Sequence, residues 1–460
     1  MHSGHWLLWV VVLWTSIFLG EDLPQLRTLR WPMLFVVACV FTVLLARRAI
    51  FFLAVCVLGM TGLSSGASAW HGHNHGVEGE CRGIAILRSD PELFTAGTSV
   101  VVELNGVRYR ASAFGMPGRR LAQRLSGESV YVGGQCGLLT GDFSRRDRVK
   151  HIVGKMSITE VSEQFGEGSA FIRAANRIRG VIAEGVASMS PENKALFLGL
   201  VIGDDRAQPQ DMVQRFRDSG LSHLCAVSGQ NVAFLLILIR PLTARRHRVV
   251  AWAISIVVIA WFVVVTRGEP SIIRASVMAG LVATSALVGK ALDTRIVLSC
   301  TVLGLLLIDP MLAWSVGFAL SVAATAGLAW FAGVCHRILR SGNTIASTVA
   351  AQLGTTPISL CVFGTAPIMS LVANPFAIPV AGVVMTIGLP LSILAVVFPT
   401  FSEIVGAVLT VPVEWVDSVA TVSAYLSPPG AVNAILWCCL GLFIMWRRRS
   451  ISPASGRHGL

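Results

Sequence analysis

Charged residues are scarce in this chain of 460 residues: Asp, Glu, Lys and Arg make up 13% of it, whereas hydrophobic residues make up 54%. A soluble domain carries about 25% charged residues, so the composition argues against a soluble protein. The mean hydropathy is +0.69, and apolar runs near the roughly 20 residues that cross a bilayer recur along most of the chain. The sequence therefore predicts a polytopic α-helical membrane protein.

Lysine is rarer still, and the net charge of +12 comes almost entirely from arginine. Many arginines stand at the ends of apolar runs, where the positive-inside rule expects them on the cytoplasmic side. The basic total therefore does not by itself indicate a nucleic-acid partner. The four lysines are Lys150, Lys155, Lys194 and Lys290.

Two enzyme motifs are missing. Neither Gly154-Lys155 nor Gly289-Lys290 is followed by Ser or Thr, so the chain carries no phosphate-loop motor. No G-x-S-x-G elbow surrounds Ser228, and on one continuous helix Ser228 and His223 would point about 140° apart. We therefore expect no enzyme activity and no cofactor. An intramembrane hydrolase that uses Ser228 as its nucleophile remains as an alternative function.

The first 70 residues predict membrane helices. Apolar runs cover about 6–19, 31–46 and 49–63, with Arg47 and Arg48 in the turn between the second and third. Arginines this close to membrane ends favour the cytoplasm. This places the N-terminus in the cytoplasm and the chain after about residue 66 outside the cell.

Segment 71–168 is more polar and predicts a β domain. Asn105-Gly106 between two alternating runs is a strong hairpin signal. Five strands in so short a segment fit a small closed barrel, with an OB-fold as the leading candidate. The predicted fold class is thus a polytopic α-helical membrane protein with one small extracellular all-β, OB-like domain. The strands are expected at 81–87, 98–104, 107–114, 129–136 and 149–161.

Cysteine usage agrees with an external β domain. Eight of the ten cysteines lie in or beside apolar segments, and only Cys81 and Cys136 lie in the polar segment. Two lone cysteines in a water-facing domain predict one disulfide if that domain is outside the cytoplasm. Just before it, His71, His73 and His75 favour a linker over a metal site, because no acidic or thiol ligand is near.

Segment 169–220 predicts amphipathic helices at about 171–189 and 208–220, of the kind that lie in the membrane interface. From 221 to 460 a second membrane block is expected. Its first helix ends in an arginine cluster from Arg240 to Arg248, so it runs from outside to inside. Residues 401–426 carry three acids and predict an amphipathic helix that does not span. Further spans are expected at 249–265, 271–289, 296–308, 311–333, 344–363, 368–398 and 431–446.

A dense polar stretch opens this block. On one helix, His223, Ser228 and Asn231 would share an arc of about 140°. Such residues either hydrogen-bond helices together or line a path for a solute, and the pattern leaves both open. Gly317, Ser321 and Thr325 mark a close helix contact by their spacing.

Two residues further along invite the same question. Arg274 lies near the start of an apolar helix, where its charge needs a partner. In a structural role, it would pair with Glu269 or reach the membrane interface. In a functional role, its guanidinium would bind a phosphate. The apolar run from residue 368 is interrupted by Asn374, Pro375 and Pro379. This pattern is typical either of a broken helix that lines a path or of a simple proline kink.

Together these residues resemble the ComEC-type competence proteins, the inner-membrane channels for DNA uptake in transformation. The likeness rests on Gly220–Leu224 with Ala226–Gly229. Supporting motifs follow in order along the chain: Gly203-Asp204, Pro270-Ser271 with Arg274-Ala275, Asp309-Pro310 with Gly317–Ser321, and Ala373–Pro375 with Pro379.

Two departures limit what the resemblance implies. Gln230-Asn231 stands where the family has a Leu-His pair, so the role of that histidine is not carried over. Relatives often continue into a metallo-β-lactamase-like nuclease domain, whereas this sequence ends at Leu460. The resemblance therefore implies a channel without its own nuclease.

The sequence thus predicts a plasma-membrane channel for single-stranded DNA, with both termini cytoplasmic; the alternative is a secondary transporter of a small anionic solute. Besides DNA and membrane lipid, the implied partners are an external DNA receptor, a separate nuclease, and a cytosolic motor or single-strand-binding protein. The residues predicted to line the path are His223, Ser228, Asn231, Arg274 and Asn374. On the OB-like domain, basic and aromatic residues would bind the strand: Arg108, Tyr109, Arg110, Phe114, Arg119, Arg120, Arg124 and Tyr131.

Overall fold

The computed structural model describes residues 3–23, 47–71, 78–94, 97–139, 143–225, 228–339 and 343–451. The predicted run 31–46 lies outside these residues, as do His73 and His75. The chain divides into two compact units. The first holds Met1–Ile178, Ala260–Pro270 and Ser299–Phe318, and the second holds Arg179–Ile259, Ser271–Leu298 and Ala319–Leu460.

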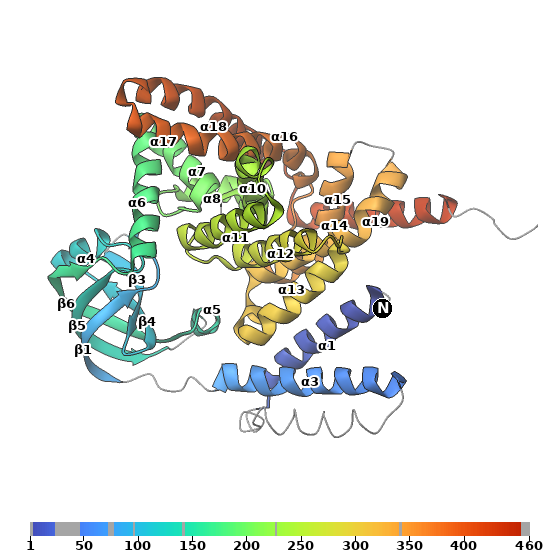
Figure 1. The fold of residues 1–460 in the computed structure, drawn as a ribbon, viewed down its shortest axis with the longest axis horizontal. Helices are drawn as coiled ribbons and strands as arrows, with labels where there is room; N and C mark the ends of the chain where they lie inside the picture. The colour runs from blue at the N-terminus through green and yellow to red at the C-terminus, as the bar shows by residue number, and fades with distance from the viewer. Residues whose placement is uncertain are drawn as a thin grey trace, which may run out of the picture. The chain divides into compact units, whose positions relative to one another are not determined.

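The first unit begins with two packed apolar helices, α1 (Ser3–Glu21) and α3 (Arg47–His71) (Figure 1). Arg47 and Arg48 belong to the first turn of α3. The helices approach closely because Gly62 and Gly66 face α1, where an added Cβ would collide with Ser16 and Ile17. At the far end, the His71 ring nitrogen lies 2.7 Å from the Glu21 carbonyl oxygen.

The β domain of this unit contains the five predicted strands and one short addition. Asn105 and Gly106 both have positive φ, 53° and 79°, and join β3 to β4 in the expected tight hairpin. Two short helices, α4 (Gly115–Ala122) and α5 (Phe143–Val149), stand in the connections before and after β5. The strands are β1 (Gly79–Leu87), β2 (Glu92–Phe94), β3 (Gly97–Leu104), β4 (Val107–Ala113), β5 (Ser129–Leu138) and β6 (Ile152–Gly166).

The strands pair in the order β1-β5-β6-β4-β3-β2, and an additional β1–β3 pairing closes a five-strand circuit. Only the β4–β6 pair in this circuit is parallel. Alternate residues point inward, as along β3, where Val100, Val102 and Leu104 join one buried cluster. Closure pairs the edges of β1 and β3.

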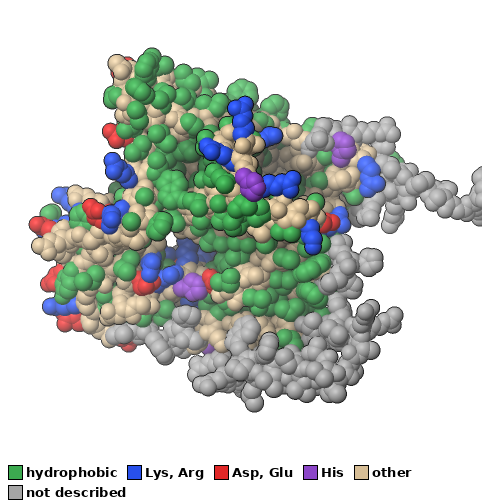
Figure 2. All heavy atoms as spheres, viewed as in Figure 1, with side chains coloured by type: hydrophobic (Ala, Val, Ile, Leu, Met, Phe, Trp, Pro, Cys, Tyr) green, Lys and Arg blue, Asp and Glu red, His purple; other side chains and the backbone are tan. Residues whose placement is uncertain are grey.

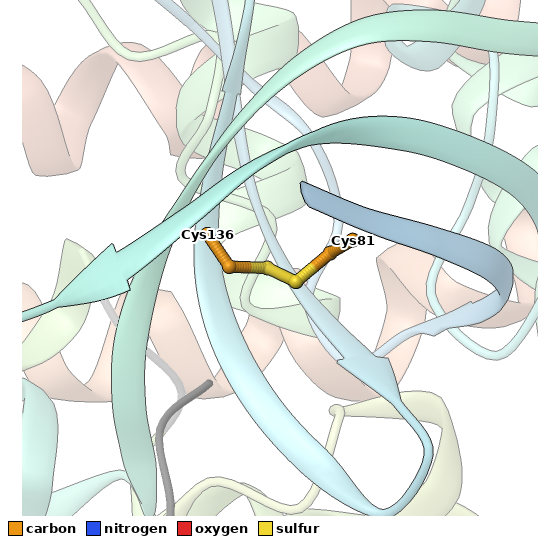
Figure 3. The surroundings of a disulfide bond; sticks show 2 residues. All are labelled: Cys81 and Cys136. Carbon is orange, nitrogen blue, oxygen red and sulfur yellow. A yellow bond between two sulfur atoms is a disulfide. The ribbon is translucent and has the colours of Figure 1, made fainter. Parts of the chain in front are cut away.

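The predicted disulfide joins Cys81 of β1 to Cys136 of β5, with a Cα–Cα distance of 5.9 Å (Figure 3). Both cysteines are buried in the core cluster of the β domain. Adjacent strands already hold these residues close, because Cys81 pairs with Gly134 and Cys136 pairs with Gly79.

The helices that follow cover the predicted amphipathic and membrane segments. Six have the length and composition to cross a membrane, with α16 and α17 counted together. Figure 2 shows hydrophobic side chains over much of the helical surface, around α11 and α12. The helices are α6 (Ala170–Gly185), α7 (Pro191–Ile202), α8 (Gln210–Asp218), α9 (Ser222–Cys225), α10 (Gly229–Thr243), α11 (Arg248–Val265), α12 (Pro270–Leu287), α13 (Thr294–Ile308), η2 (Pro310–Trp314), α14 (Val316–Leu339), α15 (Asn343–Phe363), α16 (Ser370–Val383), η3 (Val384–Gly388), α17 (Leu389–Val397), η4 (Pro399–Phe401), α18 (Ser402–Tyr425) and α19 (Gly430–Ile451).

Two expectations for the C-terminal helices differ from the structure. Residues 399–425, expected as an amphipathic helix that does not span, have the length and composition to cross a membrane. Of the two alternatives for Asn374-Pro375 and Pro379, the broken helix is not found, since α16 continues through both prolines. The irregular turn is instead the π-helix η3, where Pro390 has no N–H to donate to the Thr386 carbonyl.

Two further expectations in the second unit need correction. The segment 169–220 is not wholly amphipathic, because α7 lies within it and every residue from Ala195 to Ile202 is buried. The expected close contact at Gly317 is not found, because no described atom lies within 4 Å of a Cβ added there. Gly327 of α14 and Gly354 of α15 make that contact, each facing the backbone of the other helix.

Candidate functional site

The polar opening of the second membrane block is not one helix. α9 ends at Cys225 and α10 begins at Gly229, with Ser228 in an extended conformation (φ −98°, ψ 159°) before it. The predicted arc of His223, Ser228 and Asn231 on a continuous helix was therefore wrong. His223 is exposed on α9, whereas Ser228 and Asn231 lie together at the start of α10.

Asn231 is buried and joins two helices. Its Nδ2 donates to the Leu200 carbonyl oxygen of α7 at 2.7 Å, and its Oδ1 accepts from the Ser228 hydroxyl at 3.3 Å. Both ends of the amide thus bond to the protein, which is the structural role of a polar residue between helices. Ser228 and Asn231 also border a small pocket, lined besides them by Leu200, Leu224, Gln230, Phe234, Ile378 and Ala381.

Arg274 lies one turn into α12 and is only 6% exposed. Its Nε donates to the Ser321 hydroxyl of α14 at 2.8 Å, and its Nη1 lies 2.8 Å from Met278 Sδ. A thioether is a weak acceptor and a guanidinium has five N–H donors. The structural alternative of a pair with Glu269 is not found, and among the described residues no carboxylate pairs with Arg274.

The unpaired charge of Arg274 faces the N-terminus of α10. A Cβ added to Gly229 would lie 2.8 Å from Arg274 Nη2, so the guanidinium lies directly against the first residue of α10. The first N–H groups of a helix lack intrahelical partners and carry partial positive charge, and Ser228 makes no side-chain cap bond to them. Two adjacent positive features favour an anion between them, as at many phosphate sites.

Asn374 is also buried, in α16, and its Oδ1 has no hydrogen-bond partner in the part of the chain that the structure describes. The hydroxyl of Ser370, one turn earlier on the same face, is likewise unpartnered. Ile378, one turn after Asn374, borders the Ser228–Asn231 pocket. Because a buried unpaired polar group costs about 1–3 kcal/mol, this face of α16 is unfavourable unless water or a solute reaches it.

The Gly203-Asp204 motif has a structural role. Gly203 has positive φ (70°) and ends α7, and Asp204 pairs with Arg179 at 3.0 Å and Arg206 at 2.6 Å. Burial by itself raises the pKa of Asp204, but hydrogen bonds and charge from the two arginines hold it below its usual value. Arg179 is as deeply buried as Arg274, yet it has this acidic partner.

The predicted DNA-binding residues of the β domain do not form one free surface. Tyr109 is 2% exposed in the core, so it cannot stack on a base and that assignment was wrong. Arg108 pairs with Glu103 at 3.1 Å, Arg110 with Asp147 and Arg120 with Glu163, both at 2.5 Å. Arg124 lies over the Phe165 ring at 3.8 Å. Exposed members of the set are Phe114, Arg119 and Tyr131.

Three contributors to the site escaped the sequence reasoning. Gly229 enters the sequence analysis only as part of a motif, whereas the structure places it directly against the guanidinium of Arg274. Ser321 was assigned to a packing seam, whereas its hydroxyl accepts from Arg274. Leu200 lies in α7, an apolar run too short to span, and it supplies the carbonyl that holds Asn231.

Metal binding finds no support in the described residues, where no group of three His, Cys, Asp or Glu side chains is placed to hold an ion. The fold and site together define a multi-pass membrane protein with a small β domain and a buried, positively charged break between helices. The chain belongs to the competence protein family, because the model of that family matches residues 200–450 of the 460.

Two curated relatives each match about half of the chain. ComE operon protein 3 of Bacillus subtilis (strain 168) is 24% identical over 236 residues, which cover 50% of this chain and 30% of that protein. The uncharacterized protein YcaI of Escherichia coli (strain K12) is 28% identical over 220 residues, which cover 44% of this chain and 29% of that protein. The chain therefore matches less than a third of each relative's length. No solved structure matches it significantly.

Proposed function

We propose that this chain forms the part of the plasma-membrane path through which a single strand of DNA enters a bacterial cell in natural transformation. The observation that carries the proposal is the buried guanidinium of Arg274, which has no carboxylate partner among the described residues and faces the N-terminus of α10. This arrangement lies inside the region matched by the competence family. A phosphodiester backbone is an anion of the kind it favours.

The other polar residues of the path would act on the strand more weakly. Ser228 and the unpaired amide oxygen of Asn374 offer exchangeable hydrogen bonds. Transport requires binding strong enough for entry and weak enough for release. One buried cation with a few neutral polar groups meets that requirement better than a row of cations would. We propose that His223, which is exposed on α9, also borders the path.

The charges of the loops support an orientation for the chain. Arg245, Arg246 and Arg248 stand at the turn between α10 and α11, the end that the positive-inside rule assigns to the cytoplasm. The other end of α11 and the loop after it, Ala260–Pro270, belong to the unit that holds the β domain. Arg267, between α11 and α12, pairs with Asp90 of that domain at 2.7 Å. This supports a β domain outside the cell and cytoplasmic termini.

The β domain has the features of an OB-fold. Its five-strand circuit, its one parallel pair and the helix α4 between β4 and β5 support that assignment. The Cys81–Cys136 bond suits an oxidising compartment. We assign 71–168 to this domain, 1–70 to the N-terminal membrane helices, 169–220 to the connecting helices and 221–460 to the path itself.

The proposal implies partners. Single-stranded DNA is the solute, membrane lipid surrounds the helices, and an external receptor, a nuclease and a cytosolic motor or single-strand-binding protein would deliver, process and draw in the strand. The chain itself contributes the path and no chemical step, in keeping with the prediction of a protein that is not an enzyme.

A deletion strain of the host tests the function directly. We expect it to bind labelled double-stranded DNA at the cell surface, admit no labelled strand to the cytoplasm and yield no transformants, with recovery on return of the gene. Normal entry of DNA in the deletion strain, together with loss of uptake of a small anionic solute, would replace the proposal with the secondary-transporter alternative.

A further inference from the structure

A basic patch lies on and just after α5, outside every residue set considered so far. It consists of Arg145, Arg146, Arg148 and Lys150, and we call it the α5 patch. Arg145, Arg146 and Lys150 are exposed and Arg148 is half-buried. The only acid within this stretch, Asp147, points inward, with its side chain 8% exposed.

Most of this positive charge is not neutralised by nearby acids. Asp147 is taken by Arg110 of β4, with an Nε–Oδ2 distance of 2.8 Å. Glu21 pairs with Arg145 at 2.8 Å, and Asp309 lies 3.0 Å from the His151 ring nitrogen. Among the described residues, Arg146, Arg148 and Lys150 therefore have no carboxylate partner.

The patch is fixed at the end of the α1–α3 helix pair. The guanidinium carbons of Arg145 and Arg148 lie 5.3 and 5.8 Å from the ring centroid of Trp70, the penultimate residue of α3. Trp70 in turn lies 5.3 Å from the Trp314 ring, whose Nε1 donates to Glu21 at 3.0 Å. Cation–π contacts of this kind hold arginine side chains in place while leaving their N–H groups for a ligand.

The α5 patch also adjoins the β domain. Arg108 of β4 donates to the Lys150 carbonyl oxygen, with an Nη1–O distance of 3.5 Å, although Arg108 and Arg110 are themselves paired with Glu103 and Asp147. Lipid headgroups lie at one level, near the ends of membrane helices. Three cations without carboxylate partners, which follow one another along the chain beside a strand of the β domain, fit a polyanion with successive charges better than a headgroup.

We propose that the α5 patch binds the phosphodiester backbone of a single DNA strand where the β domain meets the end of α3. This inference rests on the proposed function and gives it a docking surface other than the arginines predicted from the sequence. The patch supplies charge without base recognition, so binding is independent of nucleotide sequence.

The test measures binding of a fluorescent oligothymidylate to the full-length protein in nanodiscs of neutral lipid, over a range of salt concentrations. The variant Arg146→Gln/Arg148→Gln removes two unpaired cations. We expect its affinity to fall about tenfold and its salt dependence, the slope of log K against log salt, to decrease by about 1.4. The matched control, Arg173→Gln/Arg177→Gln, removes two exposed arginines of α6 in the same unit and should bind like the wild type.

Equal affinity and equal salt slope in the wild type and the α5 variant would overturn this proposal and leave the proposed function standing. A variant that keeps oligonucleotide binding but loses binding to phosphatidylglycerol vesicles would overturn it in favour of lipid headgroups. Uptake in the deletion strain is judged separately, so the two proposals fail independently.

Discussion

Two buried asparagines show how the same residue type serves structure in one place and a path in another. Asn231 has both ends of its amide bonded, to Leu200 and Ser228, whereas the Oδ1 of Asn374 has no partner. The sequence placed both on the path because a polar residue in an apolar run is equally conspicuous in either role. The two roles are distinguished only by the hydrogen-bond partners, above all the Leu200 carbonyl of α7, which is distant in the sequence.

The matched substitutions Asn231→Leu and Asn374→Leu test this distinction. Asn231→Leu leaves the Leu200 carbonyl and the Ser228 hydroxyl without their partner, so we expect the free energy of unfolding to fall by about 1–3 kcal/mol. Asn374→Leu removes an unsatisfied group, so the stability should stay equal or rise while entry of labelled DNA falls. Thermal unfolding in detergent measures the change in stability, and uptake of labelled DNA by cells measures the effect on entry. Full uptake by Asn374→Leu would remove Asn374 from the path.

At the scale of elements, local patterns predicted the strands well and the interruptions of helices poorly. Asn105-Gly106 and the alternation of β3 are local signals, and the structure confirms both. The break before Gly229 and the π-turn at 384–388 depend on what packs alongside. Gly382 packs against the ring of Phe234 and Gly388 against the ring of Phe197, each with a ring carbon 2.7 Å from an added Cβ. No local sequence pattern predicts these contacts.

The strand β3 carries the clearest pH-dependent contact of the β domain. Hydrogen bonds from Arg88, and then from Arg108, outweigh the effect of burial and hold the pKa of Glu103 below its usual value of 4.5. Because the folded pKa is lowered, the ionised carboxylate stabilises the fold above pH 4.5. This stabilisation is lost as the pH falls through the lower folded pKa.

We therefore expect Glu103→Gln to reduce the free energy of opening of β1, β3 and β4 by about 1 kcal/mol at pH 6. The difference from the wild type should shrink as the pH falls below 4.5 and should vanish below the folded pKa of Glu103. Hydrogen exchange of the full-length protein, corrected for the intrinsic pH dependence of exchange, measures it. A difference of the same size at both pH values would contradict the assignment of the effect to ionised Glu103.

At the scale of the whole molecule, the sequence predicted a multi-pass membrane protein with a small β domain, and both are present. Hydropathy and strand alternation suffice for that, because each depends on solvent and not on tertiary partners. The sequence did not show which charges are free to bind an anion. Arg108 and Arg110 are conspicuous in the sequence yet paired, whereas the free charge of the α5 patch appears only once its acids are seen to be engaged.

The central claim is that the charge of Arg274 serves a passing anion and not the fold. A buried cation without an acidic partner is expensive to keep, so its replacement by an apolar side chain of similar length should not destabilise the protein. Arg179, equally buried but paired with Asp204, provides the matched control, because Arg179→Met leaves a buried carboxylate with less compensation.

The most direct measurement is the entry of labelled DNA into cells that carry Arg274→Met in place of the wild type, with the amount of protein in the membrane determined in parallel. We predict wild-type accumulation with DNA entry reduced at least a hundredfold, whereas Arg179→Met loses accumulation and entry together. Normal DNA entry in Arg274→Met cells, or loss of entry that merely follows loss of the protein, would contradict the account.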